Sequence, residues 1–386
     1  MKYCPSGARL SRDATKAREN SMQIRAAVAR APDQPFEIVD CDIAEPGPGE
    51  VLVRVKACGI CHTDLAVKLQ HIPVPLPKVL GHEGAGVIER VGPNVVGLAA
   101  GDPVLMSFGS CGGCAECQRG SPGYCNDFGN INMFGLRTGG SALRYRGAEL
   151  SAHFFAQSAF ATHAIATARN VVKVAPELPL ATLAPLGCGI QTGAGAVLNT
   201  LAPPAGTAIA VFGAGAVGLA AVMAAKLVGC TTIIAIDLRK ERLAVAREIG
   251  ATHIIDAGSG EVLDQITQIT GRGAHFSLDT TGNPAAVALS VNCLRQRGCS
   301  AQVAAPPRGT RYPLEASVIV GRGLTVRGVV EGDAVPGVFI PQLIDLFRQS
   351  LLPVDKIVTF FPFDEINRAI DEMETGTVIK PVLLMD

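Results

Sequence analysis

The first part of the chain alternates apolar and polar side chains in short runs separated by turn residues. The run Glu50–Lys56 follows the turn sequence Pro46–Gly49, and the run Gly84–Gly92 has the same period. A period of two is typical of strands with one buried face. The pattern therefore predicts an antiparallel, barrel-like domain over residues 22–190, built from short β segments.

Between residues 191 and 332 the pattern changes to strands that alternate with amphipathic helical stretches such as Lys240–Ile249. This alternation is typical of an α/β fold with a doubly wound parallel sheet of the Rossmann type. Residues 333–386 return to mixed elements and end in the apolar run Ile379–Leu384, which we expect to rejoin the first domain. The expected strands of the parallel sheet are Ala208–Phe212, Ile233–Asp237, His253–Ile255, Phe276–Asp279, and two more near Gln302 and Val326.

Composition narrows the class of partner. The 386 residues include 34 basic and 34 acidic side chains, so the formal net charge is zero. A balanced surface has no field to attract nucleic acid or an anionic membrane, and a small-molecule partner is expected instead. Twelve cysteines without a secretory signal favour a reducing, cytoplasmic location, and no apolar run reaches membrane-spanning length. Residues 1–21 are basic without apolar periodicity, and we expect a disordered tail there.

Four cysteines, Cys111, Cys114, Cys117 and Cys125, lie within fifteen residues with glycines between them. Zinc held by four thiolates is tetrahedral and closed, and glycines let so short a loop fold around the ion. The lobe over residues 107–126 is therefore predicted to hold a structural zinc. An iron–sulfur cluster is an alternative, but its usual run ends in a three-residue gap and Cys-Pro, unlike this one. A disulfide pair or unbound thiols are the remaining alternative.

The turn after the first strand of the parallel sheet carries a glycine fingerprint. Gly213, Gly215 and Gly218 form the pattern Gly-x-Gly-x-x-Gly, and Asp237 ends the next strand. The first glycine permits a tight turn, the second lets a pyrophosphate approach the backbone, and the third lets the helix pack on the strand. Asp237 can bond both ribose hydroxyls and would repel a 2′-phosphate, which predicts NAD(H) before NADP(H). Arg242 is an expected cofactor contact, and its positive charge keeps NADP(H) as an alternative cofactor. A glycine-rich turn without any ligand is the alternative.

A second set of metal-binding residue types is scattered along the chain: Cys61, then His82 and Glu83, then Cys188, each next to glycines. Singly, such a cysteine is more often a small core residue, and such a histidine more often a hydrogen-bonded surface group, than a metal ligand. Beside a dinucleotide fold, two thiolates and one imidazole are the donors of a catalytic zinc with an open fourth position, a set known from alcohol dehydrogenases.

Over residues 22–386 the chain resembles the zinc-containing, medium-chain alcohol dehydrogenases. The motifs that carry the resemblance stand in family order: Cys61-His-Thr-Asp64, Gly81–Gly86, the cysteine tetrad, Leu186–Cys188 and Gly213–Gly218. Three further runs are most similar to bacterial aryl-alcohol (benzyl-alcohol) dehydrogenases: His71–Pro77, His153–Ser158 and Gly187–Gly195. The resemblance implies a GroES-like β-barrel catalytic domain, an NAD-binding Rossmann domain over 191–332, two zinc ions per chain, and a homodimer or homotetramer.

The resemblance also implies roles for single residues in the reaction. Cys61, His82 and Cys188 match the catalytic zinc ligands, and Asp64 matches the carboxylate that orients His82. Glu83 matches a glutamate behind the zinc that can serve as a temporary ligand. Thr63 matches the hydroxyl that takes the alcohol proton.

Cofactor contacts follow from the same resemblance. His62 matches a pyrophosphate contact, Thr192 a position beside the nicotinamide, and Lys380 a C-terminal phosphate contact. The sequence departs from the family at Ala66, where many members carry a histidine that completes a proton relay to solvent. Water or another base must replace it here, with His62 and His71 as candidates.

The implied reaction is the reversible oxidation of a primary, aromatic or allylic alcohol to its aldehyde, with hydride transfer to NAD. An apolar substrate is expected if Leu65, Phe154, Phe155 and Ile190 line the pocket, although each could equally fill a core. S-(hydroxymethyl)glutathione is the alternative substrate, because the same scaffold with two zincs serves it. A non-catalytic nucleotide-binding protein is disfavoured, since such a protein has no chemical need for three metal ligands and a threonine hydroxyl.

Overall fold

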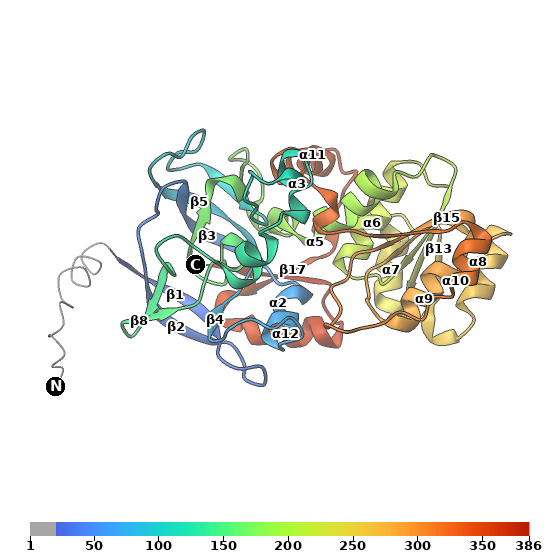
Figure 1. The fold of residues 1–386 in the computed structure, drawn as a ribbon, viewed down its shortest axis with the longest axis horizontal. Helices are drawn as coiled ribbons and strands as arrows, with labels where there is room; N and C mark the ends of the chain where they lie inside the picture. Colours follow the sequence, from blue (N-terminus) through green and yellow to red (C-terminus); the bar gives the residue numbers. More distant parts are fainter. Residues whose placement is uncertain (1–20, 386) are drawn as a thin grey trace, which may run out of the picture.

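The computed structural model describes residues 21–385, which form two sheet-built lobes side by side along the long axis (Figure 1). Apart from Ser21, the predicted tail over residues 1–21 lies outside the described residues. One lobe contains two sheets and the other contains a single parallel sheet.

The first lobe is built from a five-stranded and a seven-stranded sheet. The five-stranded sheet has the order β4 (Lys78–Val79), β1 (Met22–Ala29), β2 (Glu37–Ile43), β7 (Leu143–Tyr145) and β8 (Ala148–Leu150). The seven-stranded sheet has the order β10 (Val171–Lys173), β6 (Pro103–Met106), β5 (Glu83–Val91), β3 (Glu50–Gly59), β18 (Lys380–Leu384) and β17 (Val358–Pro362), with β9 (His163–Thr167) also paired to β3. The short helices α2 (His62–Lys68), α3 (Ala115–Gln118) and α4 (Leu180–Leu183) lie in the connections.

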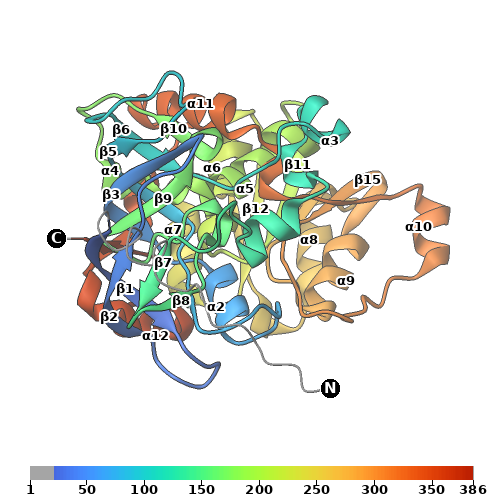
Figure 2. The same cartoon turned by 60° about the vertical axis from the view of Figure 1, so that its left-hand side comes forward.

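The last strands of the chain belong to the first lobe, where the C-terminus also lies in both views (Figure 2). β18 pairs antiparallel with β3, but it pairs parallel with β17. Helix α12 (Ile366–Thr375) joins β17 to β18 as a crossover, which parallel neighbours require. The expected antiparallel domain therefore contains one parallel pair.

The other lobe is one six-stranded parallel sheet. Its order is β13 (His253–Asp256), β12 (Thr232–Asp237), β11 (Ala208–Phe212), β14 (Ala274–Asp279), β15 (Leu294–Gln302) and β16 (Thr325–Gly328). Its helices are α6 (Ala216–Leu227), α7 (Lys240–Ile249), α8 (Val262–Thr270), α9 (Pro284–Asn292) and α10 (Ala316–Arg322), while α5 (Gly189–Gly195) and α11 (Pro336–Arg348) flank it in the chain. This order is that of a doubly wound sheet, so the predicted α/β class is confirmed.

Local sequence explains the bounds of several elements. All five residues of β11 are buried, as expected for a central parallel strand covered on both faces. Helix α9 begins where the Asn283 side chain accepts hydrogen bonds from two backbone amides, with Pro284 in the first turn. Helix α12 buries one face at a helical spacing and ends at Gly376, whose φ of 79° suits a left-handed cap.

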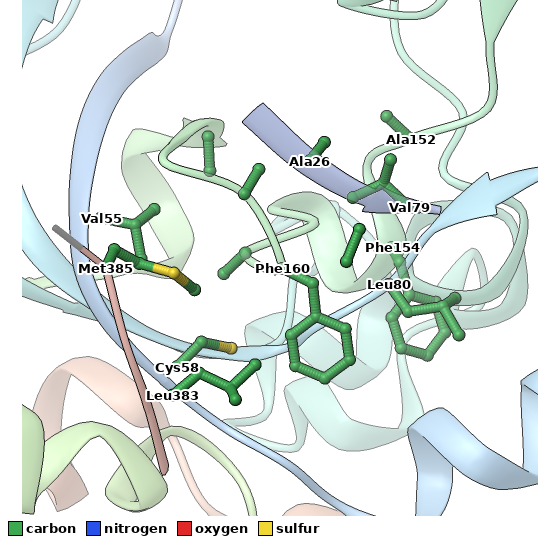
Figure 3. Packing of buried hydrophobic residues seen from close by; sticks show 14 of the residues in the cluster. Ala26, Val55, Cys58, Val79, Leu80, Ala152, Phe154, Phe160, Leu383 and Met385 are labelled. Carbon is green, nitrogen blue, oxygen red and sulfur yellow. The ribbon is translucent and has the colours of Figure 1, made fainter. Parts of the chain in front are cut away.

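Two large buried clusters hold the molecule together. The first fills the N-terminal lobe, and Figure 3 shows Cys58, Phe160, Leu383 and Met385 among its side chains. The second cluster joins the lobes, because Leu105 of β6 and Val211 of β11 both belong to it. The two lobes therefore share a continuous apolar core.

The buried carboxylate of Glu50 stabilises the first lobe in a pH-dependent way. Arg137 donates to both carboxylate oxygens, at 2.8 and 2.7 Å, and the Gly47 amide donates at 2.7 Å. Burial raises the pKa of Glu50, but His153, Arg137 and Gly47 outweigh burial and lower this pKa from 4.5 to about 2. A depressed carboxyl pKa stabilises the fold above the unfolded value and ceases to do so as the pH falls through the folded value.

We therefore expect the wild type to lose about 2 kcal/mol of unfolding free energy, relative to Glu50→Gln, as the pH falls from 6 to 3. Urea unfolding of both proteins at several pH values between 6 and 3 measures this difference. A difference that stays constant over that range would contradict the role given to Glu50.

The edge of the parallel sheet is open in the described chain: all four residues of β16 are exposed. The homodimer or homotetramer that the resemblance implies remains a prediction. Among residues 21–385, no single helix is long and apolar enough to cross a membrane. The helices Leu180–Gly187 and Gly189–Leu201 reach that length and composition only when they are taken together, and they meet at a bend of 59°.

Candidate metal and dinucleotide sites

Folding brings the scattered metal-binding residues together. Cys61 precedes α2, His82 and Glu83 stand at the start of β5, and Cys188 precedes α5. One donor atom from each of these four residues lies within 4.8 Å of every other. Residues separated by up to 127 positions thus form one cluster of two thiols, an imidazole and a carboxylate.

Asp64 orients two members of this cluster. Its Oδ1 lies 2.9 Å from His82 Nδ1, and its Oδ2 accepts from the Cys61 amide at 3.0 Å, as in a capping box of α2. The other ring nitrogen, His82 Nε2, is buried and has no hydrogen-bond partner among the described residues. A buried imidazole nitrogen beside two thiol sulfurs is a donor set that fits zinc.

Electrostatics favour the ligand form of Cys61 at the cluster, while His82 and Cys188 hold their protons. Contact with Cys188, and the charges of Lys380 and His82, lower the pKa of Cys61 well below its ordinary range. Burial acts to lower the pKa of His82, but the charge of Asp64 and its hydrogen bond raise this pKa well above the ordinary value. Contact with Cys61 and burial raise the pKa of Cys188 well above its ordinary value. A metal at this cluster would therefore take the place of the protons on His82 and Cys188.

Glu83 is held from behind by Lys380. The Lys380 amine donates to Glu83 Oε1 at 2.7 Å, lies 2.6 Å from Oε2, and donates to the Ile60 carbonyl at 2.9 Å. Burial raises the pKa of Glu83 to about 7, against the opposing charge of Lys380. Lys380 thus donates hydrogen bonds to two protein oxygens and forms an ion pair with Glu83, while the resemblance predicts a phosphate contact for it. That contact stays a prediction.

The cysteine tetrad also converges. Donor atoms of Cys111, Cys114, Cys117 and Cys125 lie within 4.8 Å of one another, with Cys111 Sγ and Cys117 Sγ 3.9 Å apart. Backbone amides point at the sulfurs: the Cys111 amide donates to Cys125 Sγ at 3.3 Å and the Cys114 amide to Cys111 Sγ at 3.4 Å. Backbone donors lower the pKa of Cys114 to about 6, which favours the thiolate that a metal requires.

The glycine turn has the conformation that its sequence predicts. Gly213 has a φ of 92°, and a Cβ added at Gly218 would lie 1.8 Å from the Gly213 carbonyl oxygen. Around Gly215, in contrast, an added Cβ would meet no described atom within 4 Å apart from its own chain neighbours, which leaves the approach that a pyrophosphate needs. Asp237 ends β12 beside this turn, where its Oδ2 accepts from the Ala214 amide at 2.6 Å.

The other predicted cofactor contacts gather near the same region. Desolvation lowers the pKa of His62, and the charges of Lys380 and Arg242 lower it further, so the three residues lie within electrostatic reach of one another. Arg242 is half-buried, and its Nε has no hydrogen-bond partner among residues 21–385. Thr192 is buried one turn after Cys188, since its amide donates to the Cys188 carbonyl at 2.9 Å.

Helix α5 joins the metal cluster to the dinucleotide turn. Cys188 is its N-terminal cap, and a Cβ added at Gly193 would lie 1.9 Å from the Val217 carbonyl oxygen in the first turn of α6. Only glycine permits this close approach. The two predicted sites therefore lie on neighbouring, directly packed helices.

Comparison with known proteins shows the family of this chain. Residues 47–176 match the model of the alcohol dehydrogenase GroES-like domain, and residues 216–349 match that of the zinc-binding dehydrogenases. Geraniol dehydrogenase of Castellaniella defragrans is 41% identical over 369 residues, which cover 95% of this chain and 99% of that protein. This chain belongs to the zinc-containing alcohol dehydrogenase family.

Solved structures of the family are also similar. An alcohol dehydrogenase zinc-binding domain protein from Burkholderia ambifaria is 50% identical with a TM-score of 0.93, and benzyl alcohol dehydrogenase from Acinetobacter calcoaceticus is 43% identical with a TM-score of 0.92. Each match covers 95% of this chain and 100% of the solved one. The resemblance to zinc-containing alcohol dehydrogenases, and to benzyl-alcohol dehydrogenase among them, is confirmed, and the chain is a zinc-dependent alcohol dehydrogenase.

Two predicted pocket residues of this dehydrogenase contact the metal cluster. The ring of Phe155 stacks on His82 with centroids 4.3 Å apart, and Phe154 meets His82 edge-on at 5.4 Å. Both phenylalanines are buried, as are Leu65 and Ile190, so all four belong to the cores of the lobes. Their role as substrate contacts stays a prediction.

The segment that follows α2 is hydrogen-bonded back to this helix. The Ile72 amide donates to the Ala66 carbonyl at 3.0 Å, which places exposed His71 at the end of this helix. His71 thus remains a candidate for the base that replaces the missing relay histidine.

Sequence reasoning missed Glu331 and Gln191. Glu331 is only 8% exposed, and its carboxylate accepts from Cys188 Sγ at 3.5 Å and from Gln191 Nε2 at 3.1 Å. Burial raises the pKa of Glu331 to about 7. One signal was available: Glu331 follows β16 closely, and functional side chains gather at the carboxyl ends of parallel strands.

Proposed function

We propose that this zinc alcohol dehydrogenase reversibly oxidises primary alcohols with an aromatic or allylic carbinol to their aldehydes, with NAD as the hydride acceptor. Two relatives support the substrate class, one named a geraniol dehydrogenase and the other a benzyl alcohol dehydrogenase. The formal net charge of zero supports an uncharged small molecule as the substrate. A cytoplasmic location accords with the many free thiols.

The observation that carries the proposal is the packing of α5 on α6. This packing sets Cys188, a predicted metal ligand, one helix away from the glycine turn that would hold the dinucleotide. Hydride transfer needs its donor carbon and acceptor ring held together in a fixed orientation. Two such sites on directly packed helices meet that requirement.

In this proposal Cys61, His82 and Cys188 hold a catalytic zinc, and the tetrad holds a structural zinc. When bound, the catalytic ion supplies Lewis acidity that makes the alcohol hydroxyl more acidic at neutral pH. Asp64 fixes the His82 ring so that Nε2 faces the cluster. Thr63 receives the alcohol proton, a role supported by its hydroxyl lying 3.7 Å from Cys61 Sγ.

Asp237 supports NAD before NADP. Its carboxylate ends β12 beside the glycine turn and repels additional negative charge there. Arg242 is the opposing influence, because its guanidinium lies near Asp237 and could pair with a phosphate.

The test is a panel of alcohols that runs from ethanol through geraniol-like allylic alcohols to benzyl alcohol, with NAD and with NADP. We expect kcat/KM for benzyl and allylic alcohols to exceed that for ethanol by at least about tenfold, and NAD to be preferred by about tenfold or more. Higher kcat/KM on S-(hydroxymethyl)glutathione than on benzyl alcohol would contradict the proposed substrate class.

A further inference from the structure

The loop that carries Glu331 has an unusual backbone. Helical turn η8 (Glu331–Asp333) places three consecutive residues at positive φ: 53° at Glu331, 69° at Gly332 and 50° at Asp333. Side chains other than glycine rarely adopt this conformation, so the contacts around the loop must hold it in place.

Contacts from the α5 side hold one face of the loop. A Cβ added at Gly332 would lie 2.2 Å from the Gln191 carbonyl oxygen, and one added at Gly195 would lie 2.3 Å from the Gly332 carbonyl oxygen. Asn199 Nδ2 donates to the Gly332 carbonyl at 3.0 Å, and Thr200 Oγ1 donates to Asp333 Oδ2 at 2.7 Å. This side sets the carboxylate of Glu331 against Cys188.

The cysteine lobe holds the opposite end of the loop through Tyr124. The Tyr124 hydroxyl donates to Asp333 Oδ1 at 2.7 Å, lies 3.1 Å from the Gly328 carbonyl oxygen, and accepts from the Val330 amide at 3.3 Å. One proton can serve only one acceptor, and the charged carboxylate at the shorter distance is the stronger one. The neighbouring Gly123 approaches so closely that an added Cβ would lie 2.9 Å from the Val330 carbonyl oxygen.

Tyr124 directly precedes Cys125, a member of the tetrad, so the geometry of the tetrad sets the position of the hydroxyl. The hydroxyl in turn ties down Asp333, two residues after Glu331. Glu331 touches Cys188, a predicted ligand of the other metal. A continuous chain of contacts therefore runs from one metal cluster to the other.

We propose that Tyr124 is a positioning residue through which the cysteine lobe holds the Glu331 loop, and with it the surroundings of Cys188, in the form that binds the catalytic metal. The inference rests on the proposed metal role of Cys61, His82 and Cys188. It assigns the lobe a second task besides stabilising the fold.

The test is Tyr124→Phe, which keeps the ring and removes only the hydroxyl. Protein that retains zinc at the tetrad is loaded with Co²⁺ at the trio, and the thiolate-to-cobalt and ligand-field absorption bands are recorded. We expect these bands to shift and a chelator to remove the cobalt about tenfold faster, as for the loss of other groups that support metal ligands. Zinc content at the tetrad should not change.

Tyr145→Phe is the matched control, because this hydroxyl lies on β7, away from the loop, and the ring contacts Arg30. Its cobalt bands and chelator rate should equal those of the wild type. Wild-type bands and rate in Tyr124→Phe, whatever its melting temperature, would show a merely structural contact and overturn the inference. If Tyr124→Phe did not fold, Asp333→Asn would replace it with the same expected results.

A double-variant cycle tests the route through Glu331. Glu331→Gln keeps the shape of the side chain and should shift the cobalt bands, and adding Tyr124→Phe should change them little further. Fully additive effects would overturn the proposed route. Failure of the wild type to bind cobalt at the trio would contradict the proposed function instead, so the two failures are distinguishable.

Discussion

Replacing Cys188 by alanine is expected to lower kcat/KM for benzyl alcohol by about 1000-fold or more and to remove one zinc per chain. The Lewis acidity of a catalytic zinc contributes several kcal/mol to the transition state, and each 1.36 kcal/mol is a factor of ten in rate. Cys188 supplies one of the two thiols of the cluster, and its neighbours Cys61 and His82 are too few to close a three-ligand site without it. Steady-state kinetics and metal analysis of the purified variant measure both effects.

Cys293→Ala is the matched control for this variant. Cys293 is also a buried thiol, but it lies in the parallel-sheet lobe and donates to the Ser290 carbonyl at 3.2 Å. The control should keep two zincs per chain and near wild-type kcat/KM. Unchanged turnover in Cys188→Ala would refute the catalytic role of the trio.

Replacing Cys125 by alanine is expected to destabilise the protein before it affects the chemistry. Structural zinc sites contribute roughly 10–16 kcal/mol through four ligands, or about 3 kcal/mol for each ligand. Cys125 is the buried member of the tetrad, and its sulfur accepts from the Cys111 amide, so its loss opens the lobe. Thermal melting and metal analysis should show a lower melting temperature together with the loss of one zinc.

Cys41→Ala is the control for removal of a buried thiol elsewhere in the N-terminal lobe, because Cys41 lies on β2. It should keep both zincs. A Cys125→Ala protein with wild-type melting temperature and zinc content, but without catalysis, would contradict the division of labour between the two metal clusters.

Local spacing was enough to predict the parts of this enzyme that depend on neighbours in the chain. The tetrad spans fifteen residues, and the glycine turn with its strand and helix is one continuous segment, so local backbone geometry brings their atoms together. Helix α7 lies at the predicted bounds because its apolar residues recur at helical spacing and Gly250 follows it. The six strands of the parallel sheet were likewise readable from alternation with helices.

The catalytic trio was predicted by resemblance and not by spacing. Cys61, His82 and Cys188 lie far apart in the sequence, and singly each is more often an ordinary core thiol or a hydrogen-bonded histidine than a metal ligand. Their convergence depends on where β3, β5 and α5 meet, which is a property of packing between segments.

Sequence alone thus established the fold class, the dinucleotide fingerprint and the metal-binding character of the tetrad, because each follows from periodicity or short-range spacing. Folding was needed to reveal the pairing of Lys380 with Glu83, the seating of Glu331 against Cys188 and the link from Tyr124 to Asp333. These contacts join residues 143 to 297 positions apart. No local pattern encodes such contacts, since they arise only when apolar burial packs distant segments of the chain together.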